Sequence, residues 1–319
     1  MSSTGSTGGT GGTGSGVHLG ANQYGKAENR VVRVLRDTPR HEVRDLTVST
    51  SLRGDFTAAH TTGDQADVLP TDTQKNTAFA FAKEKGVGAI EDYALTLADH
   101  FLEATPAATG ARIEVLEHTW ARLEVDGAGH DHAFARAGSD VRTTVVTVDG
   151  RGQDRVAQVL SGISDLVVMK TTGSAFRGFL KDRYTTLPET DDRILATSLV
   201  TRWRHDPAAV VAGVDWDASN AEARRVMLEA FATTHSEALQ QTLYAMGEAV
   251  LAARDEVVEV RFSAPNKHHF LVDLAPFGLE NPGEVFIAAD RPYGLIEASV
   301  VRDGAPGPGN AWLAVPGFC

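Results

Sequence analysis

Along the first half of the chain, hydrophobic positions alternate with polar ones, then fall three or four residues apart, and then alternate again. A two-residue period is typical of half-buried strands, and the longer period is typical of helices with one buried face. The patterns predict strands over residues 29–36 and 41–53 joined by a hairpin, a helix starting at Thr71 or Asp72, a helix over 90–103, and strands over 111–125 and 130–148. The predicted order is therefore β-β-α-α-β-β.

The second half repeats this order. It predicts strands near 163–170 and 193–204, helices over 216–235 and 236–253, and strands over 256–263, 268–274, 284–288 and 294–302. Two similar α+β modules in tandem, over residues 17–150 and 151–319, are the economical interpretation. Antiparallel sheets with helices on one face leave strand edges, which subunits can pair to close a barrel. We therefore expect an oligomer.

The composition is that of a globular protein and excludes several classes of partner. The 319 residues are 42% hydrophobic, enough for a sizeable core, and the net charge of −12 disfavours nucleic acid and anionic membranes. No stretch approaches the roughly 20 consecutive apolar residues of a membrane-spanning helix, and no secretory signal pattern is present. We expect a cytoplasmic protein with no nucleic-acid or membrane partner.

The two ends of the sequence carry little chemistry. Residues 1–16 are almost wholly Gly, Ser and Thr and predict a disordered tail. The G-x-G-x-x-G match at Gly9, Gly11 and Gly14 lacks the strand and helix of a dinucleotide site. The sequence ends in Gly-Phe-Cys instead of Ser-Lys-Leu, which favours a bacterial cytoplasm over a peroxisome. Cys319 is the single cysteine, so no intrachain disulfide is expected, and we interpret its thiol as incidental.

Two polar segments of the first half are candidates for a site. Lys26 stands just before the first strand, and Thr71 and Asp72 stand at the first helix start. Free N–H groups and hydroxyls at a helix start suit an anionic or polar ligand. From the residues alone, the favoured explanations are a solvated surface lysine for Lys26 and a simple helix cap for Thr71 or Asp72.

The second half offers further candidates. Asn266 and His268 follow Pro265 between two strand-like segments, so they lie in a turn or strand break, where polar groups often face a site. Arg193 follows an acidic run, and spacing alone favours a structural salt bridge over a role in ligand binding. Gln240 lies in a helical stretch, where glutamine is an ordinary helix former.

Metal and nucleophile chemistry have little support. His130 and His132 share one face of a strand and could chelate, but no further ligand cluster with recognisable spacing accompanies them. We therefore expect no metal site. No G-x-S-x-G elbow occurs and the sole cysteine is the last residue, which disfavours a hydrolase.

Several segments in the same order resemble the urate oxidase (uricase) family, most closely its bacterial members. The resemblance runs from about Gln23 to Phe318. Its most specific segments are residues 71–77 (TDTQKNT), Phe179 with 184–187 (YTTL), 192–195 (DRIL), 239–244 (LQQTLY) and 263–268 (SAPNKH). Independent matches in the right order make coincidence a poor explanation.

The resemblance implies the tunnelling fold, or T-fold. Two tandem modules per chain are paired into a barrel, and the barrels stack as a homotetramer. The resemblance also implies an enzyme without metal or organic cofactor, whose active sites lie between subunits. There, Thr71 and Asp72 of one chain would face a neighbour's Phe176, Arg193, Leu239 and Gln240.

By the same resemblance, five residues would hold the planar purine of urate. Arg193 would donate from two guanidinium nitrogens to one edge, and Gln240 would meet the opposite edge with its amide. Phe176 would stack on the ring. The backbone N–H groups of Leu239 and Asp72 would complete the hydrogen bonding.

The resemblance also implies how molecular oxygen is used. Lys26 and Thr71 would form a dyad in which a neutral lysine accepts a proton relayed through the threonine hydroxyl and a water, with support from His268. Asn266, together with Thr71, would hold oxygen or water above the ring. The implied products are 5-hydroxyisourate and hydrogen peroxide. A deprotonated purine is electron-rich enough to reduce oxygen itself, which is why no cofactor is expected.

The glycine-rich tail and Pro70 depart from the family, and two alternatives remain. Pro70 stands where a small non-proline residue is expected, which puts the shape of the local loop in question. A first alternative is an enzyme of the same fold acting on a pterin or a related purine-like ring. Such enzymes typically anchor the ring with a glutamate, and some have a zinc site. A second is a catalytically silent purine-binding protein. Retention of Lys26, Thr71, Asn266 and His268 together argues against the second.

Overall fold

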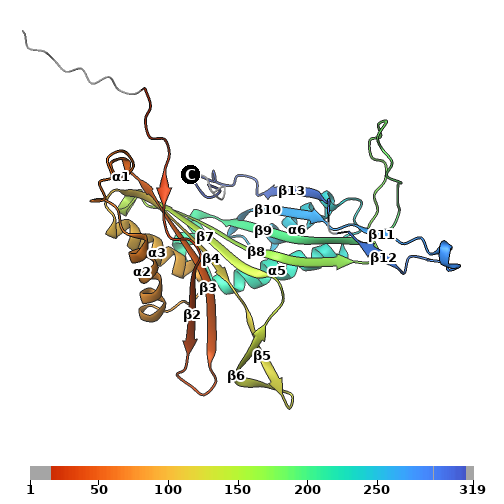
Figure 1. The fold of residues 1–319 in the computed structure, drawn as a ribbon, viewed down its shortest axis with the longest axis horizontal. Coiled ribbons are helices and arrows are strands. Elements are labelled where there is room, and N and C mark those ends of the chain that lie inside the picture. The colour runs from red at the N-terminus through yellow and green to blue at the C-terminus, as the bar shows by residue number, and fades with distance from the viewer. Residues whose placement is uncertain (1–15, 290, 314–319) are drawn as a thin grey trace, which may run out of the picture.

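The computed structural model describes residues 16–289 and 291–313 (Figure 1). Nearly all of the predicted tail, with its glycine pattern, and Cys319 lie outside the described residues. The first half contains strands β1 (Gln23–Tyr24), β2 (Asn29–Leu35), β3 (Glu42–Gly54), β4 (Ala108–Glu117), β5 (Trp120–Val125), β6 (Ala128–Arg136) and β7 (Val141–Asp149). Its helices are α1 (Thr57–Thr61), α2 (Thr71–Glu84) and α3 (Ile90–Ala104).

The second half contains the same kinds of element. Its strands are β8 (Val156–Lys170), β9 (Leu195–His205), β10 (Val257–Asn266), β11 (His269–Leu271), β12 (Phe286–Ala288) and β13 (Gly294–Val301). Its helices are α4 (Pro207–Ala212), α5 (Trp216–Thr233) and α6 (Leu239–Ala253). None of the described helices is long and apolar enough to span a membrane.

The predicted element order is confirmed, with local corrections. The predicted strands 111–125 and 130–148 are each divided in two, because the chain leaves the sheet to form the ribbon β5–β6, whose strands pair with one another. The predicted strands 268–274 and 284–288 are likewise the separate ribbon β11–β12. A ribbon and a sheet strand share the two-residue period, so the sequence cannot distinguish them. Helices α1 and α4 were not predicted, because so few residues establish no helical period.

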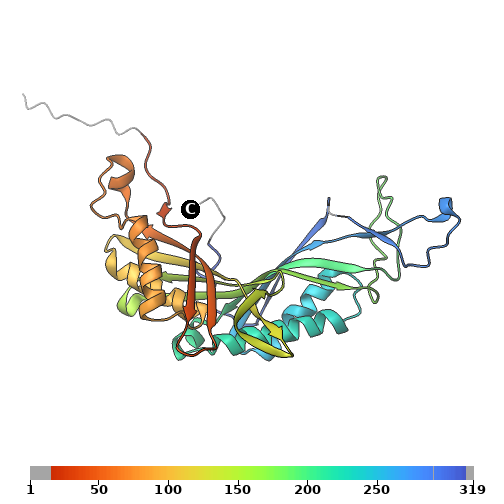
Figure 2. The same ribbon diagram turned by 60° about the horizontal axis from the view of Figure 1, so that its bottom comes forward.

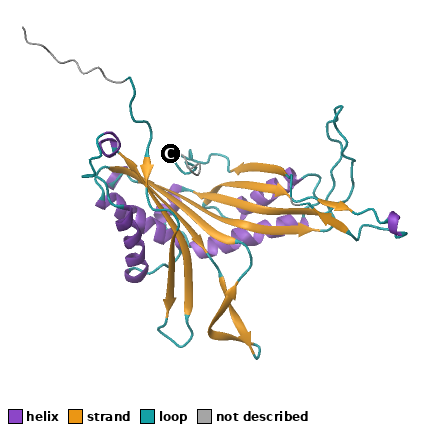
Figure 3. Cartoon of the chain, in the orientation of Figure 1, coloured by secondary structure: helices purple, strands orange, loops and turns teal. Residues whose placement is uncertain are grey.

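The remaining strands form a nine-stranded antiparallel sheet within the described residues (Figures 1 and 3). Its order is β1-β3-β4-β7-β8-β9-β10-β13, with β2 paired to β3. Helices α2, α3, α5 and α6 lie on one face of this sheet (Figure 2). A buried cluster that includes Leu97 and Ile113 lies under the first helix pair, and one that includes Met227 and Phe262 lies under the second. This layering buries the apolar face of each element.

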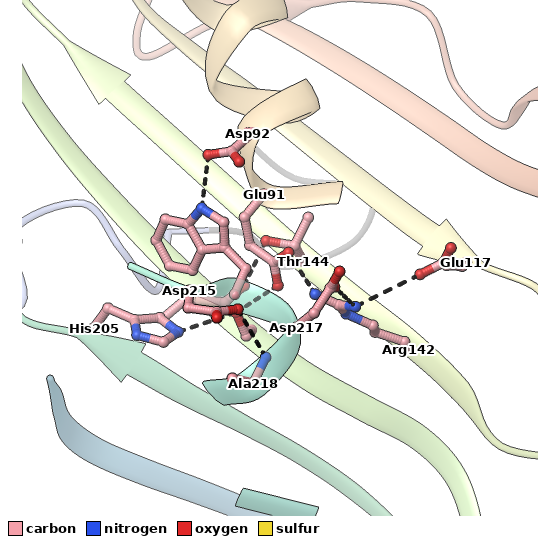
Figure 4. A network of polar contacts seen from close by, with 12 residues as sticks. Glu91, Asp92, Glu117, Arg142, Thr144, His205, Asp215, Asp217 and Ala218 are labelled. Atoms are coloured by element: carbon pink, nitrogen blue, oxygen red, sulfur yellow. Dashed lines mark hydrogen bonds and ion pairs between the residues drawn. The ribbon is translucent and has the colours of Figure 1, made fainter. Parts of the chain in front are cut away.

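The sheet is continuous across the predicted module boundary near Gly150. Strands β7 and β8 pair in register from Val141↔Ser164 to Asp149↔Val156. On the helix-covered face, Trp216 at the start of α5 donates its indole N–H to Asp92 on α3 over 2.7 Å (Figure 4). The two halves are therefore joined by both backbone and side-chain hydrogen bonds.

A buried polar network extends this junction (Figure 4). Glu91 accepts from Arg142 over 2.9 Å and from the Ser161 hydroxyl over 2.7 Å. Because Ser161 donates to the carboxylate, it accepts from His205 Nε2 at 3.0 Å, so His205 carries its proton on Nε2. Burial lowers the pKa of His205 to about 4 and raises the pKa of Glu91. The network links α3 and β7 of the first half to β8 and β9 of the second.

Candidate active site

Lys26 lies just after the short strand β1 and is held against β3 through its backbone. The Lys26 N–H donates to Thr50 Oγ1 over 3.1 Å, and the Thr50 N–H donates to the Lys26 carbonyl over 2.8 Å. The preceding residue must be glycine, because a Cβ on Gly25 would lie 1.7 Å from the Thr50 carbonyl oxygen. These contacts fix the backbone from which the Lys26 side chain extends.

Thr50 also links Lys26 to the start of helix α2. Its hydroxyl donates to Oε1 of the buried Gln74 over 2.6 Å. The side-chain amide of Gln74 in turn donates to the carbonyl of Leu69 over 3.3 Å. The backbone around Thr71 is thereby tied to that of Lys26. We call Lys26, Thr71 and Asp72 the first half-site.

Helix α2 begins without a side-chain cap. Its N-cap is Pro70, so the interpretation of Thr71 or Asp72 as the cap is wrong. The φ of −54° at Pro70 is a value that the proline ring favours, so this residue fits the local loop. Asp72 pairs instead with Lys75, whose hydrogen bond and charge lower the pKa of the Asp72 carboxyl. The N–H groups of residues 71–73 have no partner within the described residues and are free to donate to an anion.

Strands β9 and β10 place the candidates of the second half next to one another. Asn266 ends β10 and pairs in register with Thr197 of β9, and the predicted turn follows directly. Because the two strands are antiparallel, Arg193, just before β9, and His268, just after β10, meet at the same end of the sheet. Burial and, to a smaller extent, the positive charge of Arg193 lower the pKa of His268.

The acidic run before Arg193 does not neutralise it, so the expected structural salt bridge is wrong. Its carboxylates have other partners, namely Glu189 with Lys181, Asp191 with Arg177, and Asp192 with Thr172. No described carboxylate lies within the 4.0 Å of an ion pair with Arg193. Arg193 Nε is buried without a hydrogen-bond partner, and burial lowers the pKa of the guanidinium. A cation in this state suits an anionic ligand.

Phe176 lies beside this guanidinium, whose carbon is 5.0 Å from the centre of the Phe176 ring. Its backbone N–H and carbonyl pair with Thr190 over 2.8 and 3.0 Å. The Phe179 ring stacks on Phe176 at a centroid distance of 4.9 Å and an interplanar angle of 15°. A purine that stacks on Phe176 must therefore share this ring with Phe179 or displace it.

Helix α6 begins beside the same loop. The Ala175 N–H donates to the Ser236 carbonyl over 2.7 Å, which joins the Phe176 segment to the residues before α6. The N-cap Ala238 offers no side-chain hydrogen bond, and Gln240 is exposed with its amide unpaired within the described residues. The second half-site comprises Phe176, Arg193, Leu239, Gln240, Asn266 and His268.

The two half-sites do not meet within one chain. Strand β1 and helix α2, which carry the first, lie toward one end of the sheet (Figures 1 and 2). The β10–β11 turn, which carries part of the second, lies toward the other end.

Comparisons with known proteins agree along most of the chain. The sequence model of the Uricase family matches residues 22–147 and 159–297. The chain is 52% identical over 303 residues to the uricase of Arthrobacter globiformis, covering 95% of this chain and 96% of that protein. It is 35% identical over 298 residues to the uricase of Cyberlindnera jadinii, covering 89% and 97%. The chain belongs to the uricase family.

The uricase crystal structure from Arthrobacter globiformis gives a TM-score of 0.85 to this chain, covering 91% of it and 97% of that structure. The predicted α+β T-fold is thereby confirmed, and the sheet of a single chain does not close into a barrel within the described residues. Uricases are oxidoreductases that act on urate with oxygen, so the chain is an enzyme with urate as its substrate. The pterin alternative is excluded by the same matches.

Sequence reasoning missed Thr50 and Gln74, which hold the first half-site together. Gln74 lies inside the uricase-like segment 71–77, but its burial and its partner on β3 are long-range features with no local signal. The histidines His130 and His132 lie on β6 with ring centroids 4.5 Å apart. Across the described residues, no group of three or more His, Cys, Asp or Glu side chains is arranged to hold a metal ion.

Proposed function

We propose that this chain catalyses the reaction of urate, O2 and H2O to give 5-hydroxyisourate and H2O2, with no metal or organic cofactor. The observation that carries the proposal is Arg193, a half-buried guanidinium that lies beside the Phe176 ring and has no carboxylate partner among the described residues. A planar fork next to an aromatic ring suits a planar, anionic purine. Membership in the uricase family supplies the substrate.

Urate binds across the second half-site in this proposal. Arg193 donates to a carbonyl and a ring nitrogen on one edge, and the exposed amide of Gln240 meets the opposite edge. Phe176 stacks on the ring, after Phe179 has moved or from the free side. The uncapped N–H groups of Leu239 and, from a second chain, Asp72 complete the hydrogen bonds.

Oxidation requires that urate first lose a proton. Thr71 follows the segment that Thr50 and Gln74 tie to the Lys26 backbone, and it passes this proton through its hydroxyl and a water to the lysine, with support from His268. The electron-rich anion then gives two electrons to O2, which bonds to the ring carbon as a hydroperoxide. Water attacks the same carbon, and the bond from carbon to the hydroperoxide breaks to release H2O2. Asn266 and Thr71 hold oxygen and then water above the ring. The protein supplies the base that deprotonates urate, the contacts that orient the ring, and the groups that hold water above it.

The same proposal makes the site a property of the assembly. The separation of the half-sites along one sheet supports active sites between subunits, and the open sheet edges support barrel closure in a homotetramer. A single chain is then inactive. The modules over 17–150 and 151–319 and a bacterial cytoplasm stay predictions of the sequence.

The test is the loss of urate absorbance in air-saturated buffer after exhaustive treatment with a chelator, with oxygen uptake and peroxide measured in parallel. We expect one O2 consumed and one H2O2 formed per urate, at a rate that the chelator leaves unchanged. Loss of activity that returns with a specific metal contradicts the cofactor-free part of the proposal. No urate oxidation by the folded assembly contradicts all of it.

A further inference from the structure

The carboxylate of Asp192 joins two segments that each carry a proposed urate contact. Its oxygens accept hydrogen bonds from Thr172 Oγ1 at 2.7 Å, the Gly173 N–H at 2.9 Å and the Ser174 N–H at 3.4 Å. These donors lead directly into Phe176, and Asp192 directly precedes Arg193. One side chain therefore ties the backbone of Arg193 to the backbone of Phe176.

Further contacts extend this tie to helix α6. The Ser236 N–H donates to the carbonyl of Gly173 over 2.9 Å, and Ser236 also accepts from Ala175. Thr190 Oγ1 donates to the Asp192 carbonyl over 2.7 Å and so supports the same corner. The segment 172–175, which is hydrogen-bonded to Asp192, is thus also hydrogen-bonded to Ser236, which lies just before Leu239.

A carboxylate suits this position because its oxygens only accept. Oδ1 accepts from the Gly173 and Ser174 N–H groups, and Oδ2 accepts from the Thr172 hydroxyl. An amide could keep both backbone contacts on its oxygen and turn its NH2 group to the Thr172 hydroxyl, which also accepts, so removal of the side chain is what breaks the tie. The hydrogen bond from Thr172, with smaller contributions from the backbone N–H groups of Ser174, Gly173 and Arg193, lowers the pKa of the Asp192 carboxyl, which is therefore charged at neutral pH. Charge-assisted hydrogen bonds of this kind are stronger than neutral ones.

We propose that Asp192 is a positioning residue for urate binding, which sets the Arg193 fork against the Phe176 ring without touching the substrate. The inference rests on the urate contacts proposed above for Arg193 and Phe176. Recognition of a planar ligand by a fork and a ring tolerates displacements of only about half an ångström. Loss of the tie therefore weakens urate binding more than it slows the chemical step.

Asp192→Ala tests the proposal, with Asp191→Ala as the control. Asp191 is the adjacent acid, 81% exposed, and its ion-pair partner among the described residues is Arg177. We expect Asp192→Ala to raise both KM and the anaerobic Kd for urate about tenfold, with kcat changed by less than about threefold. Asp191→Ala should leave all three constants unchanged, and Asp192→Glu should restore part of the affinity.

A double-mutant cycle separates positioning from general stability. Thr172→Ala removes one donor and should weaken urate binding less than Asp192→Ala does, with little further effect in the Asp192→Ala background. If Asp192→Ala lowers the melting temperature while KM stays unchanged, Asp192 only stabilises the fold and the inference is wrong. If Asp192→Ala does not fold, an unchanged KM in Thr172→Ala contradicts the inference.

Arg193→Gln separates failure of this inference from failure of the proposed function. If Arg193→Gln leaves anaerobic urate binding intact, the proposed binding site itself is wrong. If Arg193→Gln weakens binding and Asp192→Ala does not, the proposed binding site is supported and the proposed role of Asp192 is wrong.

Discussion

The indole N–H of Trp216 donates to the carboxylate of Asp92 over 2.7 Å, joining the first turn of α5 to the first turn of α3. Trp216 is only 4% exposed and packs into the core cluster of the first half, although it belongs to the second. The pair therefore couples the stability of the two halves.

We expect Trp216→Phe to lower the free energy of unfolding by roughly 1–3 kcal/mol, because it removes this hydrogen bond and leaves a small cavity. The measurement is the midpoint of urea unfolding at constant protein concentration. Tyr244→Phe, which trims an aromatic side chain that is 58% exposed, is the control and should shift the midpoint little. Equal shifts of the midpoint in both variants would show that the Trp216–Asp92 hydrogen bond contributes no measurable stability.

His205 makes the stability of the protein depend on acid. Burial lowers its pKa to about 4 from an ordinary value of 6.5, so between these values the unfolded state binds the proton and the folded state does not. The free energy of unfolding should therefore fall by roughly 3 kcal/mol as the pH drops through this window, with no further loss below it. Glu91, whose pKa burial raises, acts in the opposite direction.

His205→Gln isolates this effect, because glutamine keeps an N–H donor for Ser161 but does not titrate. Urea titrations of the two proteins from about pH 7 to pH 4 should give a shallower loss of stability in the variant. The charges of Glu256 and Arg254, which also act on His205, remain in both proteins. Parallel profiles would mean that His205 is not the titrating group.

Arg193→Lys should reduce kcat/KM for urate by roughly 10- to 100-fold, because lysine keeps the charge but loses the planar fork. The unfolding midpoint should stay unchanged, since no described carboxylate depends on Arg193. Arg183→Lys, on an exposed arginine that contacts Tyr184, is the control for the same chemical change. A large loss of stability in Arg193→Lys would indicate that Arg193 has a structural role.

Lys26→Met should lower turnover by orders of magnitude while anaerobic urate binding stays nearly intact, because lysine accepts a proton in the proposal and does not hold the purine. Stopped-flow oxidation and equilibrium binding give the two quantities. Lys83→Met, at an exposed position of α2, controls for the loss of a positive charge. Equal losses in rate and affinity would mean that Lys26 mainly binds.

Sites shared between chains predict complementation. Lys26→Met chains and Arg193→Gln chains should each be nearly inactive alone, yet mixed assemblies should regain activity in up to about one quarter of their sites. The regained sites take the first half-site from one variant and the second from the other. Co-refolding of equal amounts, followed by the urate assay, measures the recovery. Absence of recovery in verified mixed assemblies would place the whole site within one chain.

The sequence predicted the fold better than it predicted the site. The long helices and sheet strands follow from periods that burial on one face imposes, whereas the ribbons β5–β6 and β11–β12 share those periods and could not be separated from the sheet. For Arg193, spacing favoured a salt bridge. It does not form, because Lys181, Arg177 and Thr172 occupy the nearby carboxylates, a result of folding that spacing does not contain.

The resemblance to a family predicted the site residues, but it did not predict the residues that hold them in place. The path from Lys26 through Thr50 and Gln74 to the start of α2 crosses elements far apart in sequence. No local pattern marks such a path, since each residue is ordinary for its own element. Long-range hydrogen bonds of this kind have to be read from the folded chain.

The pairing of β7 with β8 restricts motion of the two halves of the chain relative to one another. A hinge between the two halves would have to break the ladder that runs from Val141↔Ser164 to Asp149↔Val156, together with the Trp216–Asp92 tie. The two halves of each chain therefore move together as one rigid body. In the proposed reaction, entry of urate and release of peroxide then depend on movement of the loop between β8 and β9 and on small shifts of one chain against another.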